Sequence, residues 1–177
     1  VIAQKNGYMA TFMAKCSKDW PGQSGHVHIS LKSGSGESVF HEADRPHSMS
    51  DAMRWFVGGQ QRLMPELLAM VAPTINSYRR LIPGFWAPTD STWGVENRTT
   101  ALRVIPGSAK SQRVEYRVAA ADANPYVILS AALASGLWGI ENKVEPEPLV
   151  TGNAYDRKYP ARLALPRTLW DSAQKLK

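Results

Sequence analysis

Two histidines and a hydroxyl group alternate with apolar side chains in residues 25–30, which read Gly-His-Val-His-Ile-Ser. Successive side chains of a β-strand point to opposite faces, so we expect His26, His28 and Ser30 on one face and the apolar residues on the other. Imidazole nitrogen is a ligand suited to Mn²⁺ or Zn²⁺, or to a Mg²⁺ site rich in carboxylates. A solvent-exposed polar face explains the same alternation, so this segment alone does not establish a metal or substrate site.

A carboxylate between two guanidinium groups is the second candidate, within residues 112–118, which are predicted as a strand. Alternation along that strand places Arg113, Glu115 and Arg117 on one face. Such a row is often a structural ladder of ion pairs. In a functional interpretation, Glu115 binds a metal ion and the two arginines hold phosphate and carboxylate groups. The segment by itself leaves both interpretations open.

Three further arginines stand in polar segments. Arg98 and Arg103 are five positions apart, so an uninterrupted strand would point them to opposite faces. If both serve one pocket, a turn or bulge must separate them; the alternative is one inward-facing and one surface arginine. Arg80 belongs to residues 76–81, which are unremarkable by themselves and are explained by a helix cap with solvated arginine side chains.

The formal net charge of the 177 residues is +6. Much of the excess lies between Arg79 and Arg117, a stretch with seven cationic and three acidic residues. Such a cluster fits a nucleic-acid face, a solvated surface or a pocket for small anions. No Lys/Arg-rich run or interleaved aromatic platform supports nucleic acid. Six of the seven cations are arginine, whose planar fork suits carboxylate and phosphate, so the pattern favours a small-anion pocket. The seven are Arg79, Arg80, Arg98, Arg103, Lys110, Arg113 and Arg117.

The hydrophobic patterns predict an α+β domain with a largely antiparallel β-sheet and flanking helices. Capping residues mark two long helices. Ser50 precedes one that runs to about Val71, and Asn124 with Pro125 precedes one that runs to about Glu141. Strands are expected at residues 8–16, 26–32, 38–40, 99–105 and 112–118, and shorter helices at 76–81 and from 166–169 onward.

The length allows one domain with a hydrophobic core, and 44% hydrophobic with 20% charged residues excludes a largely disordered chain. We expect residues 1–177 to be a fragment of a single domain truncated at both ends, because both ends fall within helical patterns. Neither a signal peptide nor a membrane span is expected. Cys16, the only cysteine, excludes an internal disulfide and is expected to be buried, in a protein of a reducing compartment.

Taken together and in order, these segments resemble the C-terminal catalytic region of the glutamine synthetase family. The resemblance is strongest over residues 8–142 and rests on the blocks ATFMAK, GHVHIS, NSYRRLIPG, NRTTALR, RVEYR and ANPY. Family members make γ-glutamyl phosphate from glutamate and ATP, and an amine then displaces the phosphate with the help of Mg²⁺ or Mn²⁺. The resemblance therefore implies an ATP-dependent ligase with the fold of a glutamine synthetase catalytic domain.

The resemblance also implies roles for individual residues. His26 and Glu115 match metal ligands of the family. Arg80 and Arg117 match arginines that hold the carboxylates of glutamate, and Arg98 matches a catalytic arginine between the γ-phosphate and the substrate. The residues that match contacts to ATP are His28, Ser30, Arg103, Lys110 and Arg113.

One departure from the family pattern bears on the product. Family enzymes that use ammonia carry a glutamate in the loop after the NSYxRLxPG block, and Trp86 stands in its place here. An indole cannot accept a proton, although its face can hold a cation or an alkyl chain. The chain resembles γ-glutamylpolyamine and other γ-glutamylamide synthetases more closely, so we expect an amine larger than ammonia, contacted by Trp86. A glutamine synthetase that uses ammonia, and a non-catalytic member that binds ligand or scaffolds an oligomer, remain alternatives.

The remaining expectations concern the whole protein. By resemblance, its partners are glutamate and an amine, with no nucleic acid or membrane, in a cytoplasmic protein that forms a large homo-oligomer. The other carboxylate ligands of the family lie upstream of the position matched by Val1. We therefore expect the isolated fragment to be inactive.

Overall fold

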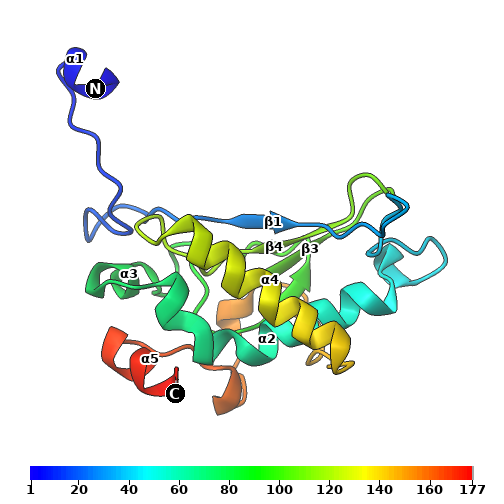
Figure 1. Ribbon diagram of the computed structural model, residues 1–177. Helices are drawn as coiled ribbons and strands as arrows, with labels where there is room; N and C mark the ends of the chain where they lie inside the picture. Colours follow the sequence, from blue (N-terminus) through cyan, green and yellow to red (C-terminus); the bar gives the residue numbers. More distant parts are fainter. Residues whose placement is uncertain (177) are drawn as a thin grey trace.

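Four strands form one mixed sheet in the computed structural model, which describes residues 1–176. Its central strand β4 is antiparallel to both β1 and β3, whereas β2 at the edge is parallel to β3. The helices α2 and α4 lie on one side of this sheet (Figure 1). The predicted α+β architecture with a largely antiparallel sheet is confirmed. In spatial order, the strands are β1 (Val27–Ile29), β4 (Arg113–Tyr116), β3 (Leu102–Ile105) and β2 (Trp93–Val95).

The two long helices begin at the predicted caps. The Ser50 hydroxyl accepts a hydrogen bond from the Met53 amide at the start of α2, and Asn124 accepts one from the Tyr126 amide at the start of α4. The helices are α1 (Ile2–Lys5), α2 (Asp51–Val71), α3 (Ile75–Arg80), α4 (Pro125–Glu141) and α5 (Leu169–Lys175). Short 3₁₀ turns are η1 (Pro46–Ser48), η2 (Ala154–Asp156) and η3 (Ala161–Leu163).

The hydrophobic core lies between the sheet and these helices. A Cβ added to Gly59 of α2 would come within 2.5 Å of the Cα of Gly139 in α4, so only glycine permits this close approach. The strands contribute their alternate side chains to the same core. Among the buried members are Phe40, Met53, Phe56, Leu68, Leu102, Val104, Val114 and Tyr116.

The apolar run at residues 8–16 does not form the predicted strand. Within residues 1–176 it pairs with no strand. Met9 and Phe12 are exposed in the segment that leads away from the body of the molecule, whereas Ala14 and Lys15 are buried against it (Figure 1). A strand needs a neighbouring strand for its backbone groups, whereas here Gln23 and Asn76 bond only to Thr11, Ala14 and Lys15 near the end of the run. Cys16 is exposed, so the prediction of a buried thiol was also wrong.

Two smaller differences concern the sheet. Residues 38–40 contribute only an isolated bridge between Lys32 and Ser38 instead of a strand. The edge strand β2 was not predicted, because three residues are too few to give an alternating pattern.

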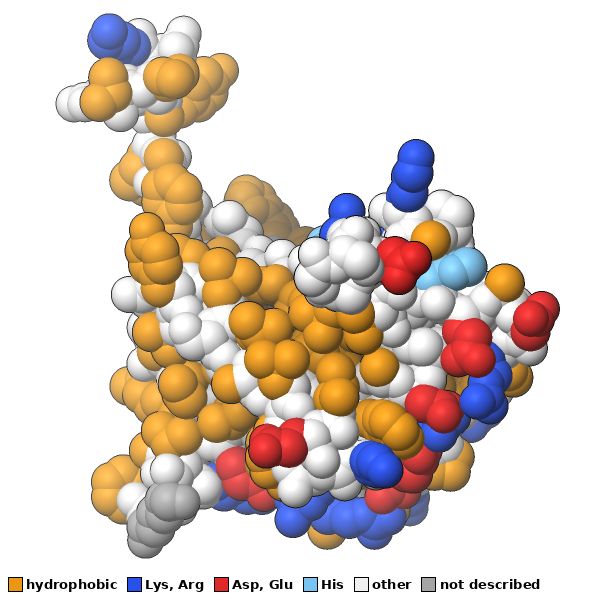
Figure 2. Space-filling view, turned by 45° about the vertical axis from the view of Figure 1, so that its right-hand side comes forward, with side chains coloured by type: hydrophobic (Ala, Val, Ile, Leu, Met, Phe, Trp, Pro, Cys, Tyr) orange, Lys and Arg blue, Asp and Glu red, His pale blue; other side chains and the backbone are white. Residues whose placement is uncertain are grey.

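Helix α4 is apolar on both sides. Its inner side packs on α2, whereas Tyr126, Leu129, Leu133 and Leu137 are exposed on the outer side. Figure 2 shows hydrophobic side chains gathered on this face. Within the described residues, no helix combines the length and hydropathy that crossing a bilayer requires.

Candidate active site

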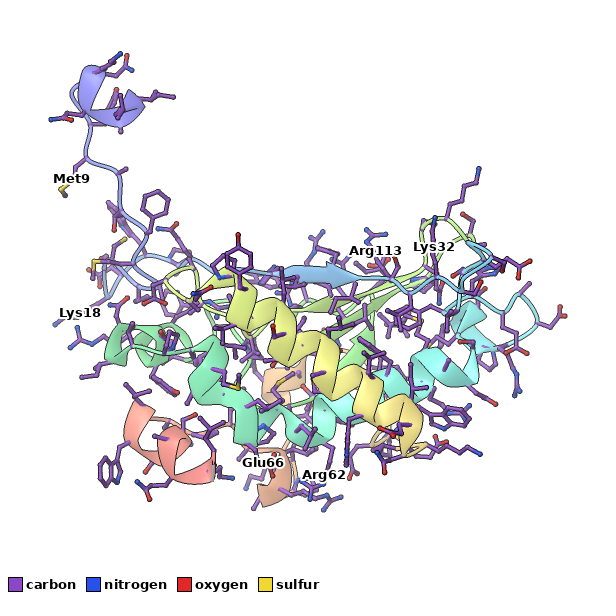
Figure 3. The ribbon with its side chains drawn as sticks, in the orientation of Figure 1. Met9, Lys18, Lys32, Arg62, Glu66 and Arg113 are labelled. Carbon is purple, nitrogen blue, oxygen red and sulfur yellow. The ribbon has the colours of Figure 1, made fainter. Side chains whose placement is uncertain are left out.

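The polar side chains of the sheet converge on the face that α2 and α4 leave free. In the sheet register, Glu115 of β4 lies opposite His28 of β1 on one side and opposite Arg103 of β3 on the other. Arg113 points away from α2 and α4 (Figure 3). The predicted alternation of β4 is thereby confirmed, because Val114 and Tyr116 point into the core.

Glu115 is the centre of this polar cluster and is only 4% exposed. Its Oε1 lies 2.9 Å from His26 Nδ1 and accepts a hydrogen bond from Arg117 Nη1 at 3.0 Å. Its Oε2 accepts one from Arg103 Nη1 at 3.1 Å. Burial alone would raise the pKa of Glu115, but the hydrogen bond from His26, the charge of Arg117 and the hydrogen bond from Arg103 hold that pKa at about 2. The carboxylate is therefore ionised at neutral pH.

His28 forms the outer edge of the cluster. Arg113 Nε donates a hydrogen bond to His28 Nδ1 at 3.3 Å, so that nitrogen acts as an acceptor. Burial lowers the pKa of His28, the charge of Arg113 lowers it further, and Glu115 opposes both. His28 is therefore a neutral imidazole at physiological pH.

Arg117 joins the cluster to two loops. Its Nη2 donates to the carbonyl of Arg98 at 2.9 Å and to the carbonyl of Trp86 at 3.4 Å. A turn and a bend at residues 98–101 separate Arg98 from Arg103, as expected if both arginines serve one pocket. The backbone of both loops is thus fixed to the same buried guanidinium group.

Arg80, Ser30 and Lys110 stand apart from this ion network. Arg80 is 3% exposed, and its guanidinium donates to the carbonyls of Arg117 and Val118 at 2.8 and 2.9 Å. Burial, and then the charge of Arg117, lower the pKa of Arg80 to about 10. Ser30 and Lys110 are exposed at the ends of the strands. The geometry thus gives Arg80 a structural task, and its contact with substrate stays a prediction.

A cavity of about 1160 Å³ opens beside the cluster. Three predicted site residues line it, namely Trp86, Arg98 and Arg103. Trp86 is 62% exposed and has a positive φ of 58°, an uncommon conformation for a residue other than glycine. In the described chain, two of the predicted substrate residues and one predicted nucleotide residue therefore share one opening.

Two residues that line the cavity were not assigned from the sequence. Glu96 pairs with Arg103, and the Tyr155 hydroxyl donates to the carbonyl of Ala87 at 3.0 Å, beside Trp86. The only sequence feature that could have indicated a site role for Glu96 was its position directly before Asn97 and Arg98. Tyr155 is 69 positions from Trp86, and no local pattern links the two.

The metal-binding capacity of the cluster is partial. His26 and Glu115 offer a nitrogen and an oxygen donor of the kinds that Mn²⁺ accepts. In this structure, however, the two side chains contact each other through these atoms. Residues 1–176 contain no group of three or more His, Cys, Asp or Glu side chains placed to hold a metal ion. The described residues can therefore supply only part of a coordination shell.

The arrangement suits chemistry on anions. Guanidinium groups that are already fixed by carbonyls and carboxylates need no reorganisation when negative charge develops nearby. Arg98 and Arg103 face the open cavity, while Arg117 and Glu115 are buried behind them. Such a site can hold phosphate and carboxylate groups side by side.

Comparison with known proteins agrees with this chemistry. The model of the family "Glutamine synthetase, catalytic domain" matches residues 1–177. Type-1 glutamine synthetase 2 of Dictyostelium discoideum is 48% identical over 180 residues, which cover 99% of this chain and 34% of that protein. Glutamate–isopropylamine ligase of a Pseudomonas species is 46% identical over 154 residues, which cover 87% of this chain and 34% of that protein.

A solved structure gives the same result for the fold. The chain described as apo GmaS without ligand superposes with a TM-score of 0.86 at 33% identity, covering 99% of this chain and 40% of that one. The present chain spans about a third of the length of the two curated relatives, the Dictyostelium and Pseudomonas proteins. From the whole-length family match, the fold and the identities, we conclude that the chain belongs to the glutamine synthetase family.

Proposed function

We propose that this chain is part of the catalytic domain of an ATP-dependent ligase that joins glutamate to an amine larger than ammonia. The γ-carboxylate oxygen of glutamate attacks the γ-phosphorus of ATP, and ADP leaves. The amine nitrogen then attacks the acyl carbon of γ-glutamyl phosphate. The bond to phosphate breaks, and the nitrogen gives up a proton to form the amide.

The charges of the site support this reaction class. Phosphoryl transfer to a carboxylate brings several negative charges together, and positioned cations stabilise them. In the proposal, Arg98 lies between the γ-phosphate and the substrate, and Arg117 and Arg80 serve the carboxylates of glutamate. The nucleotide contacts are His28, Ser30, Arg103, Lys110 and Arg113.

The cofactor assignment follows the family. The proposal includes ATP and a divalent ion, Mg²⁺ or Mn²⁺, which would offset phosphate charge. His26 and Glu115 would provide two of its ligands, and the others would come from parts of the protein outside these residues. The whole protein is proposed to be a large cytoplasmic homo-oligomer without nucleic-acid or membrane partners, and the fragment alone to be inactive.

Trp86 is the observation that carries the choice of amine. Its side chain is exposed and lines the cavity together with Arg98. Ammonia-using members carry a glutamate at the matching loop position, whereas an indole offers no base but a flat surface for alkyl groups. A relative named glutamate–isopropylamine ligase supports an acceptor of this kind within the family.

An acceptor panel tests the proposal on the protein at its full natural length. Phosphate release would be measured with glutamate and ATP plus ammonia, ethanolamine, 1-aminobutane, 1,4-diaminobutane or spermidine. We expect kcat/KM for at least one organic amine to exceed that for ammonia by tenfold or more. Efficient turnover with ammonia alone would instead assign a glutamine synthetase, the activity for which the Dictyostelium relative is named. No phosphate release with any acceptor would favour a non-catalytic member.

A further inference from the structure

Glu96 is the only carboxylate among the described residues that line the large cavity. The other ionisable groups there are Arg98, Arg103, His47 and the Tyr155 phenol. A cavity walled by guanidinium groups repels a protonated amine. An amine acceptor that carries positive charge therefore needs an anionic partner at this wall, and Glu96 alone can provide it within residues 1–176.

The carboxylate of Glu96 is held at one oxygen and open at the other. Arg103 donates to Glu96 Oε2 through Nε at 3.0 Å and also through Nη2. In the described chain no donor is hydrogen-bonded to Glu96 Oε1. The side chain is 50% exposed, so Oε1 remains accessible to a ligand.

The backbone of Glu96 has an uncommon conformation. Its φ is 50°, a left-handed value that is rare for a residue other than glycine. Trp86, on the same cavity wall, also has a positive φ. Backbone outliers of this kind often accompany functional sites, and three of them, His47, Trp86 and Glu96, line this one cavity.

Arg103 links Glu96 to the central cluster. Its third hydrogen bond runs from Nη1 to Glu115, so one guanidinium group bridges the carboxylate of the cluster and the carboxylate of the cavity. Glu96 is thus tied through Arg103 to the polar cluster, while its side chain lines the cavity. This geometry suits recognition of a substrate group rather than transfer of its proton.

We infer that Glu96 is a specificity-determining residue that binds the second, non-reacting ammonium group of a diamine or polyamine acceptor. The inference rests on the proposed function. The attacking nitrogen must be neutral, so it gains little from a fixed carboxylate, whereas a second amino group stays protonated throughout. Glu96 Oε1 would accept its hydrogen bond, and the exposed Trp86 ring would cover the alkyl chain between the two nitrogens.

The test compares two acceptors that differ only in the second amino group, 1,4-diaminobutane and 1-aminobutane. In the full-length protein, we expect Glu96→Gln to raise the KM for the diamine by about tenfold or more, the effect of losing one charge-assisted hydrogen bond. The KM values for 1-aminobutane, glutamate and ATP are expected to change less than twofold. Glu96→Asp, which keeps the charge, should retain part of the preference for the diamine. Glu66→Gln on the outer side of α2 is the matched control and should leave all four values unchanged (Figure 3).

Three outcomes contradict the inference. An unchanged KM for the diamine in Glu96→Gln would overturn it. A rise in the KM for ATP with both amines affected equally would assign Glu96 to holding Arg103 instead. If the unmodified protein uses ammonia and neither organic amine, the proposed function fails first, and this is visible before any variant is made. Melting temperatures of both variants separate a loss of folding from a loss of recognition.

Discussion

The two faces of the sheet use the same strands for different purposes. On the helix side, Val114, Tyr116 and Leu102 are fully or almost fully buried among apolar neighbours. On the other side, the alternate residues of the same strands, Glu115 and Arg103, form ion pairs around one carboxylate. Because side chains alternate along each strand, one face of the sheet packs the hydrophobic core and the other face carries the polar cluster. Substitutions on the two faces should therefore have different consequences.

Leu102→Ala is expected to have the largest effect on stability. Leu102 is fully buried in β3, and truncation of a buried leucine lowers the free energy of unfolding by about 2–5 kcal/mol. Denaturant unfolding would measure the change. The fraction that remains folded should keep its KM values, because Leu102 points away from the polar cluster. A selective rise in the KM for glutamate or ATP would break the separation of the two faces.

Arg117→Met is expected to have a smaller effect on stability and a larger one on activity. It removes hydrogen bonds to Glu115, Arg98 and Trp86, while Glu115 keeps Arg103 as a partner. The loss in unfolding free energy should be about 1.5–3 kcal/mol, and kcat/KM should fall at least about 100-fold, the scale for one positioned donor.

Arg113→Met provides the matched comparison, because Arg113 begins β4 and Arg117 directly follows it. Arg113 is more exposed, and within residues 1–176 its side chain bonds only to His28 and the carbonyl of Ser111, so the stability loss should stay below that of Arg117→Met. An equal loss in both variants would show that burial of the ion pairs does not set their contribution.

Structural features that depend on neighbouring residues in the sequence were predicted correctly. Ser50 and Asn124 mark helix starts because their side chains satisfy free amide groups, and alternation along β4 places Glu115 with Arg113 and Arg117. The six linked residues of the polar cluster, His26, His28, Arg103, Arg113, Glu115 and Arg117, were all candidates from the sequence.

Predictions were wrong or missing where the outcome depends on distant neighbours. Residues 8–16 have the composition of a strand, but a strand also needs a pairing partner. Strand β2 forms because it pairs with β3, and a sequence of three residues contains no pattern from which this pairing could be predicted. Glu96 became a candidate only through the cavity and the open oxygen of its carboxylate.

The composition of the amide product tests the central claim most directly. The full-length protein would be supplied with glutamate, ATP, and equal concentrations of ammonium and 1,4-diaminobutane, and the products would be identified by mass spectrometry. With Trp86 at the acceptor loop and Glu96 in the cavity, the γ-glutamyl derivative of the diamine should dominate. Glutamine as the main product would contradict both the choice of acceptor and the role given to Trp86.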